Sequence, residues 1–501
     1  MGDVFILDGV WYDSRTMSLE DFRNDRIKKL EKLREAGVNP YPSDSRRTHR
    51  IGNVLNDFDA LVTAQKAVSI TGRVMAQRGH GGLTFLDIDD GSGVLQFLFK
   101  RDAMDGADYD FFVSVIDAGD VIEASGLLFL TKRNERTLQV DSWRMLSKSI
   151  RPLPEKWHGL EDAEERLRHR SVDFIMRPEE REVFQKKAQF WRATREFLIE
   201  QGGLEVETPI LELIPGGADA EPFKTHMNAL DIDLYMRIAP ELNLKRLITG
   251  GFEKIFEIGR VFRNEGIDRE HLQDYTTMEM YWAYTDYEQL MELVERLVRH
   301  TVQATLGGLT HTYRGQTIDW GMPWRRIDYY EVFQKYTGLD LATASEDDLK
   351  KYAQSQGIDT KQHVGRGRLI DIVFKKNVRP ELIEPSFLVL PPVDIEPLAK
   401  RYPHDPKRVE RFQILACGSE LGKGFSELND PLDQRARFQE QAALGEAGDK
   451  EAQRMDEDYV EVLEQAMPPT AGFSYSERLF AFLLDRPIRE TTFFPIIRPK
   501  E

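Results

Sequence analysis

Five short strand patterns between residues 67 and 146 limit what this chain can fold into more than any other feature. They cover residues 68–74, 83–88, 94–99, 120–129 and 136–140, and a turn sequence (Asp-Gly-Ser-Gly, 90–93) joins the second to the third. One irregular insertion, around residues 101–119, separates the third from the fourth. Five strands in so short a stretch predict a small closed β-barrel. Barrels of this kind are also common structural modules, so the strand pattern alone does not establish binding.

The parts of the chain before and after the barrel do not show this pattern of short strands. Residues 18–37 predict a helix with Ser18 as its N-cap, and residues 150–178 read as a charged connector. The remainder mixes long helical patterns with strands, which predicts one large α+β domain. We therefore expect an α+β multidomain protein with an N-terminal helix and barrel (1–149), a connector (150–178) and a large domain (179–501).

The charge balance argues at first against a nucleic-acid partner. The chain carries 68 Lys and Arg against 85 Asp and Glu, a net charge of −17, whereas phosphate contacts need cations. Net charge averages over faces that differ, and residues 18–50 hold nine basic against six acidic residues. No apolar run is long enough to span a bilayer, so we expect no membrane partner. The single cysteine, Cys417, allows no internal disulfide and suggests a reducing, cytoplasmic location.

The most informative window for chemistry is a strand–loop–strand pattern over residues 256–281. The first strand presents Arg260 and leads to Arg263, and the second begins at Tyr275. A guanidinium group can fork onto a phosphate while an aromatic ring stacks on a base, so the pattern suits a nucleotide. Taken alone, this window would fit equally well an ordinary hairpin whose arginine forms an ion pair.

A family resemblance separates these alternatives. Residues 262–267 (FRNEGI) resemble motif 2 of the class II aminoacyl-tRNA synthetases, in the form of the lysyl-tRNA synthetase family (subclass IIb). Residues 197–200 and 205–209 resemble motif 1, whose proline (Pro209) lies at the dimer interface of that family. Further stretches match the lysyl form: residues 151–159, 215–218, 234–247, 250–253, 424–431 and 456–472. The resemblance runs from about residue 20 to the C-terminus. It implies an OB-fold anticodon barrel followed by a catalytic domain with an antiparallel sheet flanked by helices, in a homodimer.

The resemblance also implies a two-step reaction. L-lysine and ATP give lysyl-adenylate and diphosphate, with Mg²⁺, and the lysyl group then passes to the 3′ end of tRNA(Lys). On this basis Arg263 is expected to clamp the α-phosphate and the lysine carboxylate, and Tyr275 to stack on adenine. Arg478 matches the second ATP-binding arginine, and Glu265 and His271 match the motif 2 loop that meets adenine or phosphate.

The resemblance also implies which residues bind lysine. Selectivity for lysine needs buried acids that face the ε-ammonium group, because an unpaired buried charge is costly. The acids at the lysine-binding positions of the family are Glu241 and Glu427, with Tyr281 as a hydrogen-bonding partner. Phe425 belongs to the matching stretch 424–431 that contains Glu427. The α-amino group is expected to meet Glu279 and the backbone of Gly217 and Ala218.

In the barrel, four residues match anticodon-reading positions of the family: Arg78, Phe85, Gln96 and Glu135. One aromatic ring stacked on an unpaired base contributes about 1–3 kcal/mol, so a strongly basic barrel is not required. Strand alternation by itself favours the other interpretation slightly, in which Phe85 is part of the barrel core.

Departures from the family pattern concern metal, phosphate and lysine binding and the sequence of motif 3. The two magnesium-binding acids of the family correspond here to Gln413 and Glu420, so we expect Mg²⁺ to be bound mainly by the ATP phosphates and Glu420. A phosphate-binding arginine is replaced by Glu270, for which Arg269 is expected to substitute imperfectly. Lys423 replaces an asparagine that helps to bind lysine. Motif 3 (residues 472–478) has serines at glycine positions and is one residue shorter.

Three functions remain open at this point. The first is an active ligase that charges tRNA with lysine. The second is a paralogue that ligates lysine or a related amino acid to a protein, against which the barrel argues. The third is a non-catalytic relative that binds tRNA or ATP, and its support is Gln413, Glu270 and the altered motif 3.

Overall fold

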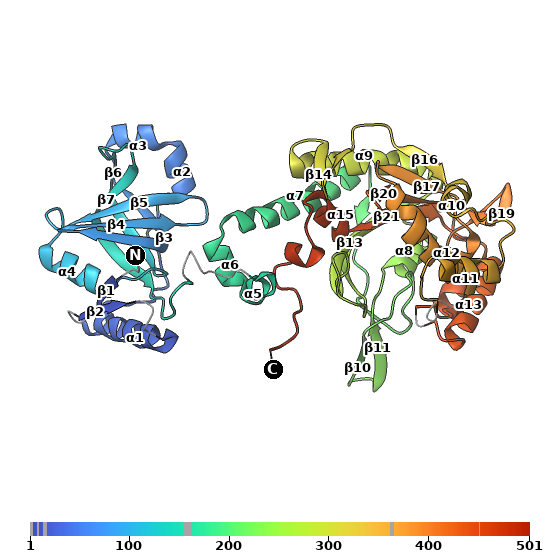
Figure 1. The fold of residues 1–501 in the computed structure, drawn as a ribbon, viewed down its shortest axis with the longest axis horizontal. Coiled ribbons are helices and arrows are strands. Elements are labelled where there is room, and N and C mark those ends of the chain that lie inside the picture. Colours follow the sequence, from blue (N-terminus) through green and yellow to red (C-terminus); the bar gives the residue numbers. More distant parts are fainter. Residues whose placement is uncertain are drawn as a thin grey trace. The chain divides into compact units, whose positions relative to one another are not determined.

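The computed structural model describes residues 4–7, 10–13, 18–154, 162–360, 365–449 and 451–500. The chain forms two compact units, Met1–Pro178 and Glu179–Glu501 (Figure 1). Most of the connector sequence that matched the family, from residue 155 onward, lies outside the described residues. The matching proline-rich start of that connector, residues 151–154, belongs to the first unit.

The first unit contains the predicted barrel. Its strands are β3 (Val68–His80), β4 (Leu83–Asp89), β5 (Val94–Lys100), β6 (Val121–Leu130) and β7 (Arg136–Ser147), closed in the order β3-β4-β5-β7-β6. All five strand predictions are confirmed, and β3 and β7 extend further than expected. The insertion that looked irregular contains a helix, α4 (Gly106–Val115). This helix packs on the barrel core, where the ring of Phe112 stacks on Phe99 at 3.8 Å.

Several short elements of the first unit have no counterpart in the predictions. The predicted N-terminal helix is present as α1 (Leu19–Glu35), with Ser18 and Asp21 forming a capping box. Ahead of it β1 (Val4–Leu7) pairs with β2 (Val10–Asp13). Short helices follow α1 and occupy the connector: α2 (Ile51–Asn56), α3 (Phe58–Ala64), α5 (Ala163–Arg168) and α6 (Arg170–Met176). Their brevity explains why no helical period was visible in the sequence.

The second unit is built on an eight-stranded sheet with the order β16-β17-β20-β21-β22-β13-β12-β8. The strands are β8 (Leu204–Glu205), β12 (Lys254–Phe262), β13 (Asp274–Ala283), β16 (Arg325–Asp328), β17 (Ser386–Val389), β20 (Arg411–Ala416), β21 (Ser419–Ser426) and β22 (Thr470–Ser476). The centre is antiparallel as expected, but β8 and β16 pair in parallel with their neighbours, so the sheet is mixed. The parallel pairs are joined through helices, which parallel strands require.

Helices cover the sheet on both faces, and the two faces of β22 show the division. α7 (Glu179–Glu200) and α9 (Tyr287–Leu306) lie together on one face, where Tyr475 packs its ring against Phe190 and Trp191. Because strand side chains alternate, Gly472 and the two serines of motif 3 point to the opposite face.

The remaining elements of the second unit lie around the sheet. They are β9 (Leu211–Glu212), β10 (Lys224–Met227), β11 (Ile232–Met236), α8 (Glu241–Thr249), β14 (Thr310–Tyr313), β15 (Gln316–Asp319), α10 (Tyr329–Thr337), α11 (Glu346–Ser355), α12 (Gly365–Val373), β18 (Arg401–Tyr402), β19 (Asp405–Val409), α13 (Pro431–Glu446), α14 (Glu457–Glu464) and α15 (Glu477–Leu483). Among the described residues, no helix has the length and apolar character needed to cross a membrane.

Candidate active site

Cross-strand pairing arranges the functional side chains in rows across the open face of the large sheet. One row runs through Gln413, Lys423, Ser474 and Glu279, which are successive register partners on β20, β21, β22 and β13. The next row, two residues along each strand, contains Arg411, Phe425, Gly472 and Tyr281. Residues far apart in the sequence therefore meet because strand register fixes them side by side.

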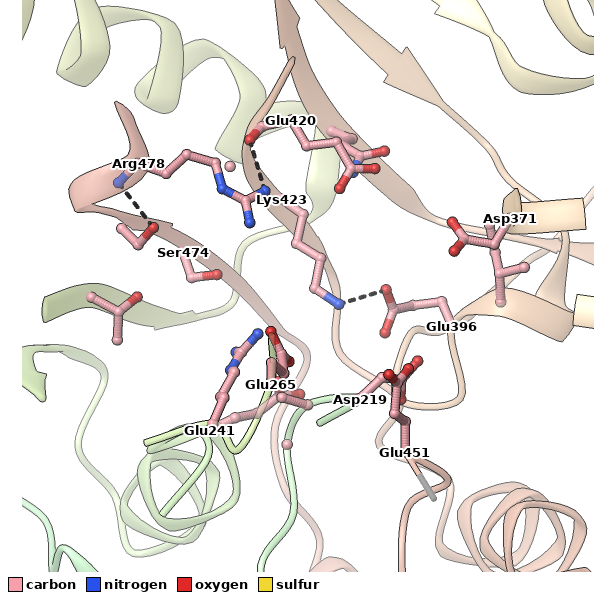
Figure 2. A pocket seen from close by; sticks show the side chains of 18 of the residues that line it. Asp219, Glu241, Glu265, Asp371, Glu396, Glu420, Lys423, Glu451, Ser474 and Arg478 are labelled. Atoms are coloured by element: carbon pink, nitrogen blue, oxygen red, sulfur yellow. Dashed lines mark hydrogen bonds and ion pairs between the residues drawn. The ribbon is translucent and has the colours of Figure 1, made fainter. Parts of the chain in front are cut away.

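A cavity of about 490 Å³ opens over these rows (Figure 2). Eleven carboxylate side chains and six lysine or arginine side chains line it. Of the residues predicted from the sequence, it gathers Gly217, Ala218, Glu241, Arg263, Glu265, His271, Tyr275, Glu279, Gln413, Glu420 and Arg478. Tyr281, Phe425 and Glu427 are not in the cavity wall and lie buried behind it.

Two arginines stand out among the six cavity cations. Arg368, Lys375, Arg411 and Lys423 each form an ion pair with a cavity carboxylate. Within the described part of the chain, Arg263 and Arg478 form none: Arg263 donates to the carbonyl of Ile238 at 3.2 Å, and Arg478 donates to the carbonyls of Glu270 and Glu420 at 3.3 and 3.4 Å. Their charges are therefore available to an anionic ligand.

An aromatic ring lies beside the first of these arginines. The guanidinium carbon of Arg263 is 5.6 Å from the ring centre of Tyr275, which packs with Leu272, Ala481 and Ile488. Burial raises the pKa of Tyr275, so the phenol stays uncharged. The predicted His271 is also at this end, with its Nδ1 2.7 Å from the carboxylate of Asp268. A ring, two guanidinium groups without a carboxylate partner among the described residues, and a polar loop suit a nucleotide.

The opposite end of the site is acidic and contains a residue that the sequence reasoning missed. Lys245 on α8 is fully buried, and its Nζ donates to Glu241 Oε1 at 2.7 Å. The same ammonium group is also in ion-pair contact with Glu427. The spacing of four residues between Glu241 and Lys245 on a helix was the available signal. Burial alone would lower the pKa of Lys245, but the two carboxylates raise it well above its usual range, so it stays charged.

Between the two ends lies Glu279, whose Oε2 accepts a hydrogen bond from the Tyr281 hydroxyl at 3.1 Å. Burial, reinforced by Glu241, raises the pKa of Glu279 to about 8. Gly217, with a φ of +83°, passes so close to Glu241 that a Cβ would lie 2.8 Å from the Glu241 Cβ. A glycine is therefore required where this backbone lines the site.

Lys423 does not place an unmatched charge in the pocket. Its Nζ lies 2.9 Å from Oε2 of the buried Glu396, and the Nε of Arg411 is 3.4 Å from the same oxygen. Figure 2 shows the Lys423 side chain extended toward Glu396. Although burial opposes the shift, Lys423 and Arg411 lower the pKa of Glu396. The sequence reasoning did not single out Glu396.

The candidate metal ligands lie in another part of the cavity wall. Glu420 on β21 and Gln413 on β20 both line it. Against the effect of burial, Lys375 and three arginines hold the pKa of Glu420 at about 2, so its carboxylate is ionised. The Glu270 carboxylate accepts a hydrogen bond from Ser419 at 3.0 Å. Arg269, expected to replace the missing phosphate-binding arginine, instead pairs with Asp485 at 2.7 Å and is not in the cavity wall.

The barrel carries the four predicted anticodon residues on its outer face or rim. Phe85 is half-buried, whereas Leu86 and Ile88 of the same strand fill the core, so the core interpretation of Phe85 is wrong. Its register partner Arg78 pairs with Asp87 through two hydrogen bonds of 2.7 and 2.8 Å.

The other two barrel residues lie at the same end of the strands. Gln96 is the register partner of Asp87, and its Oε1 accepts from Thr137 at 3.0 Å. Glu135 is exposed just before β7. The hydrogen bonds to Asp87 raise the pKa of Arg78 against the effect of burial, and the nearby charge of Glu135 adds to that rise.

Comparisons with known proteins agree with this geometry. The family model described as tRNA synthetases class II (D, K and N) matches residues 162–498, and the model for the OB-fold nucleic acid binding domain matches residues 68–146. A protein of Roseiflexus castenholzii, named lysine--tRNA ligase, is 46% identical over 97% of this chain and all of its own length. Proteins of the same name from Carboxydothermus hydrogenoformans and Thermoanaerobacter sp. are each 44% identical, over 95% and 98% of this chain and 98% and 99% of their own.

The matches cover both units of the fold and nearly the whole sequence. Barrel, sheet and cavity are thus the parts expected of an aminoacyl-tRNA ligase, and the relatives named above share one activity by name. This chain belongs to the class II tRNA synthetase family, in the group that contains the lysine--tRNA ligases.

Proposed function

We propose that this protein is a lysine--tRNA ligase that makes lysyl-adenylate from L-lysine and ATP and transfers the lysyl group to tRNA(Lys). The observation that carries the proposal is the polarity of the cavity. Two arginines without carboxylate partners, among the described residues, stand at the end with the aromatic ring, and buried carboxylates stand at the other. Residues 1–149 would bind the anticodon, residues 179–501 would catalyse, and residues 150–178 would connect them.

In the first step the lysine carboxylate oxygen attacks the α-phosphorus, the bond from that phosphorus to the bridging oxygen breaks, and diphosphate leaves. Arg263 would bind both anions and offset the charge that develops between them, while Tyr275 stacks on adenine. Arg478 would contact the nucleotide from the start of α15. Glu265 and His271 in the β12–β13 loop would complete this end.

The lysine substrate would lie along the two rows of the sheet. Its α-ammonium group would meet Glu279 and the backbone of Gly217 and Ala218, and its ε-ammonium group would reach Glu241 and Glu427. Phe425, a member of the second row, would contact the aliphatic chain, since its ring is buried beside Lys245 and Lys423. A neutral or anionic side chain at this position would leave buried carboxylates unpaired, which disfavours it.

The candidate metal ligands Glu420 and Gln413 suit a magnesium ion that arrives with ATP. Glu420 supplies an ionised carboxylate and Gln413 an amide oxygen, and both are hard oxygen ligands. Two such groups leave most coordination positions to phosphates and water. When bound, the ion would neutralise phosphate charge.

In the second step the 3′-terminal hydroxyl of tRNA attacks the lysyl carbonyl and AMP leaves. The barrel would select the tRNA at its anticodon. Phe85 offers a ring at the surface for a base to stack on, and Gln96, Arg78 and Glu135 offer hydrogen-bonding groups around it. Recognition through a few exposed bases does not require a basic protein, which accommodates the net charge of −17.

A homodimer is part of the proposal. Large exposed apolar side chains concentrate around the end of α7 and the segment after it, at Ile199, Leu204, Ile210, Leu211 and Leu213. The motif 1 proline, Pro209, lies in the same segment. Apolar surface on adjacent elements is typical of a subunit interface. A cytoplasmic location is proposed from the single cysteine, which suits a reducing compartment.

The test measures the two steps separately on the purified protein. Lysine-dependent ATP–diphosphate exchange should be present, and total tRNA should be charged with lysine and not with the other standard amino acids. Arg263→Gln should reduce exchange by about 100–1000-fold, the usual effect of removing one charge-stabilising donor. Protein labelling without tRNA charging would point to the paralogue, and ATP and lysine binding without exchange would point to a non-catalytic relative.

Phe85→Ala distinguishes the barrel from the catalytic unit. It should leave exchange unchanged and weaken tRNA use by about 5–150-fold, equivalent to about 1–3 kcal/mol for one stacked base. Leu127→Ala, at another exposed apolar position of the barrel, is the matched control and should change neither. Equal loss of both activities in Phe85→Ala would contradict its assignment.

A further inference from the structure

A lysine side chain of the protein itself occupies the site proposed for the side chain of substrate lysine. Lys245 is fully buried, and it pairs with Glu241 at 2.7 Å and with Glu427. These are the two acids to which the proposed function assigns the ε-ammonium group, so the inference rests on that function. An ammonium group at these acids would compete with the substrate for the same oxygens, unless each acid keeps an oxygen free of it.

Both carboxylates keep an acceptor oxygen that Lys245 does not use. Glu241 lines the cavity, and Glu427 is only 1% exposed. Oε2 of Glu427 is in contact with Lys245, whereas Oε1 receives no hydrogen bond from any described donor. Oε1 and the Tyr281 ring lie against the backbone of Gly472, where an added Cβ would collide with both. A buried carboxylate oxygen without a donor calls for one from a ligand.

Lys245, Glu241 and Glu427 form a trio, and most titratable groups that face this trio are neutral or have a partner of their own. Tyr281 on β13 and Tyr459 on α14 face it, and burial raises the pKa of both phenols, so they stay neutral. Glu396 is paired with Lys423 and Arg411, and Arg246 on α8 is paired with Asp456 at 2.9 Å. Glu279 on β13 is assigned to the substrate α-ammonium group. With Lys245 charged and both acids ionised, the trio carries one net negative charge.

We propose that Lys245 is a positioning residue that holds Glu241 and Glu427 ionised before substrate arrives, so that the pocket binds one ammonium group without an accompanying proton exchange at these acids. Burial raises the pKa of both carboxyls, and the Lys245 ammonium opposes that effect. Without it, two buried carboxylates that share a site would take up a proton. That proton would have to leave when lysine binds, and lysine binding would then depend on pH.

The experiment counts protons by calorimetric titration of L-lysine into the full-length protein, in two buffers with different ionisation enthalpies. Lys245→Met should release about one more proton per lysine bound than wild type. Its Kd should exceed the wild-type Kd, and the ratio should grow about tenfold per pH unit as pH falls. The titration of ATP should give the same Kd in both proteins. Protons released from Glu279 appear in both proteins and cancel in the difference.

Two further variants keep the test decisive. Lys148→Met is the matched control, because Lys148 is equally buried between Asp117 and Asp120 in the barrel unit, and its proton count should equal wild type. The double variant Lys245→Met/Glu427→Gln restores one net negative charge. It should return the proton count to the wild-type value, and this count can be measured even where Lys245→Met fails to fold.

The outcomes separate the inference from the proposed function. Equal proton counts in wild type and Lys245→Met would overturn the inference while lysine binding by the wild type upholds the function. Release of the extra proton by the double variant would also overturn the inference. Failure of the wild-type protein to bind lysine would overturn the proposed function and the inference with it.

Discussion

Replacement of Gly472 by alanine tests the geometry of the lysine-binding end directly. Gly472 on β22 lies between Phe425 of β21 and Tyr281 of β13 in the register of the sheet. An added Cβ would overlap Glu427 Oε1 and would lie 2.7 Å from the Tyr281 Cδ1 atom. Neither neighbour can move freely, because Glu427 contacts Lys245 and the Tyr281 hydroxyl is bonded to Glu279.

The expected magnitude follows from overpacking. Inserting one methyl group into a well-packed site costs about 1–3 kcal/mol. If that cost falls on the lysine-bound state, in which the ε-ammonium group must also fit beside Glu427, the KM for lysine should rise by about 5–150-fold. The KM for ATP should stay within about twofold, because Tyr275 and the two unpaired arginines lie at the other end of the cavity.

The assay is ATP–diphosphate exchange with lysine and ATP varied in turn. Gly424→Ala is the control, because its Cβ would lie 2.6 Å from the Phe412 ring and 2.7 Å from the Gly472 carbonyl oxygen. Gly424 alternates with Phe425 and so faces away from the lysine site. Gly424→Ala should lower thermal stability without a selective rise in the KM for lysine. An unchanged KM for lysine in a folded Gly472→Ala protein would refute the reasoning, as would an equal rise in the control.

Three further predictions concern pH, metal and stability. Because burial and Glu241 raise the pKa of Glu279 to about 8, the KM for lysine should fall about fivefold from about pH 7 to 8, and Glu279→Gln should remove that slope. The same shift lowers folding stability as pH rises from the unfolded pKa through about 8, so denaturant unfolding of Glu279→Gln should lose part of this pH dependence. Gln413→Glu, which adds a carboxylate beside Glu420, should lower the Mg²⁺ concentration needed for half-maximal exchange; an unchanged requirement would remove Gln413 from the metal ligands. Arg237→Met should lower the free energy of unfolding in urea by about 3–5 kcal/mol, because it removes the guanidinium group that lies 2.5 Å from the buried Glu257 carboxylate. Adding Glu257→Gln to this variant should recover most of the lost stability.

The sequence was sufficient wherever a local pattern was long and its two faces differed. The barrel strands are short runs bounded by turns, and the hairpin of β12 and β13 is bounded by a polar loop, so both were predicted, although β3 and β7 extend further than expected. Motif order supplied the candidate site residues, and eleven of them line one cavity. Short helices such as α2 and α5 escaped because six residues cannot display a helical period.

Phe85 marks the limit of strand patterns. In β4 both alternating sets contain apolar residues, so the sequence could not decide which set faces the core. The closed barrel decides it, because Leu86 and Ile88 meet the side chains of the other strands inside and Phe85 is left outside with Arg78. Arg269 is a similar case, since its pairing with Asp485 joins residues more than two hundred positions apart.

What the sequence alone determined is the family, the two kinds of fold and the candidate site residues that belong to motifs, because these are properties of local pattern and motif. The tertiary structure alone decided which charges are matched. Arg411 and Lys423 share Glu396, Lys245 joins two acids from different elements, and Arg263 is left without a carboxylate among the described residues. Charge pairing depends on distance and burial after the chain has folded, and neither quantity is written in residue order.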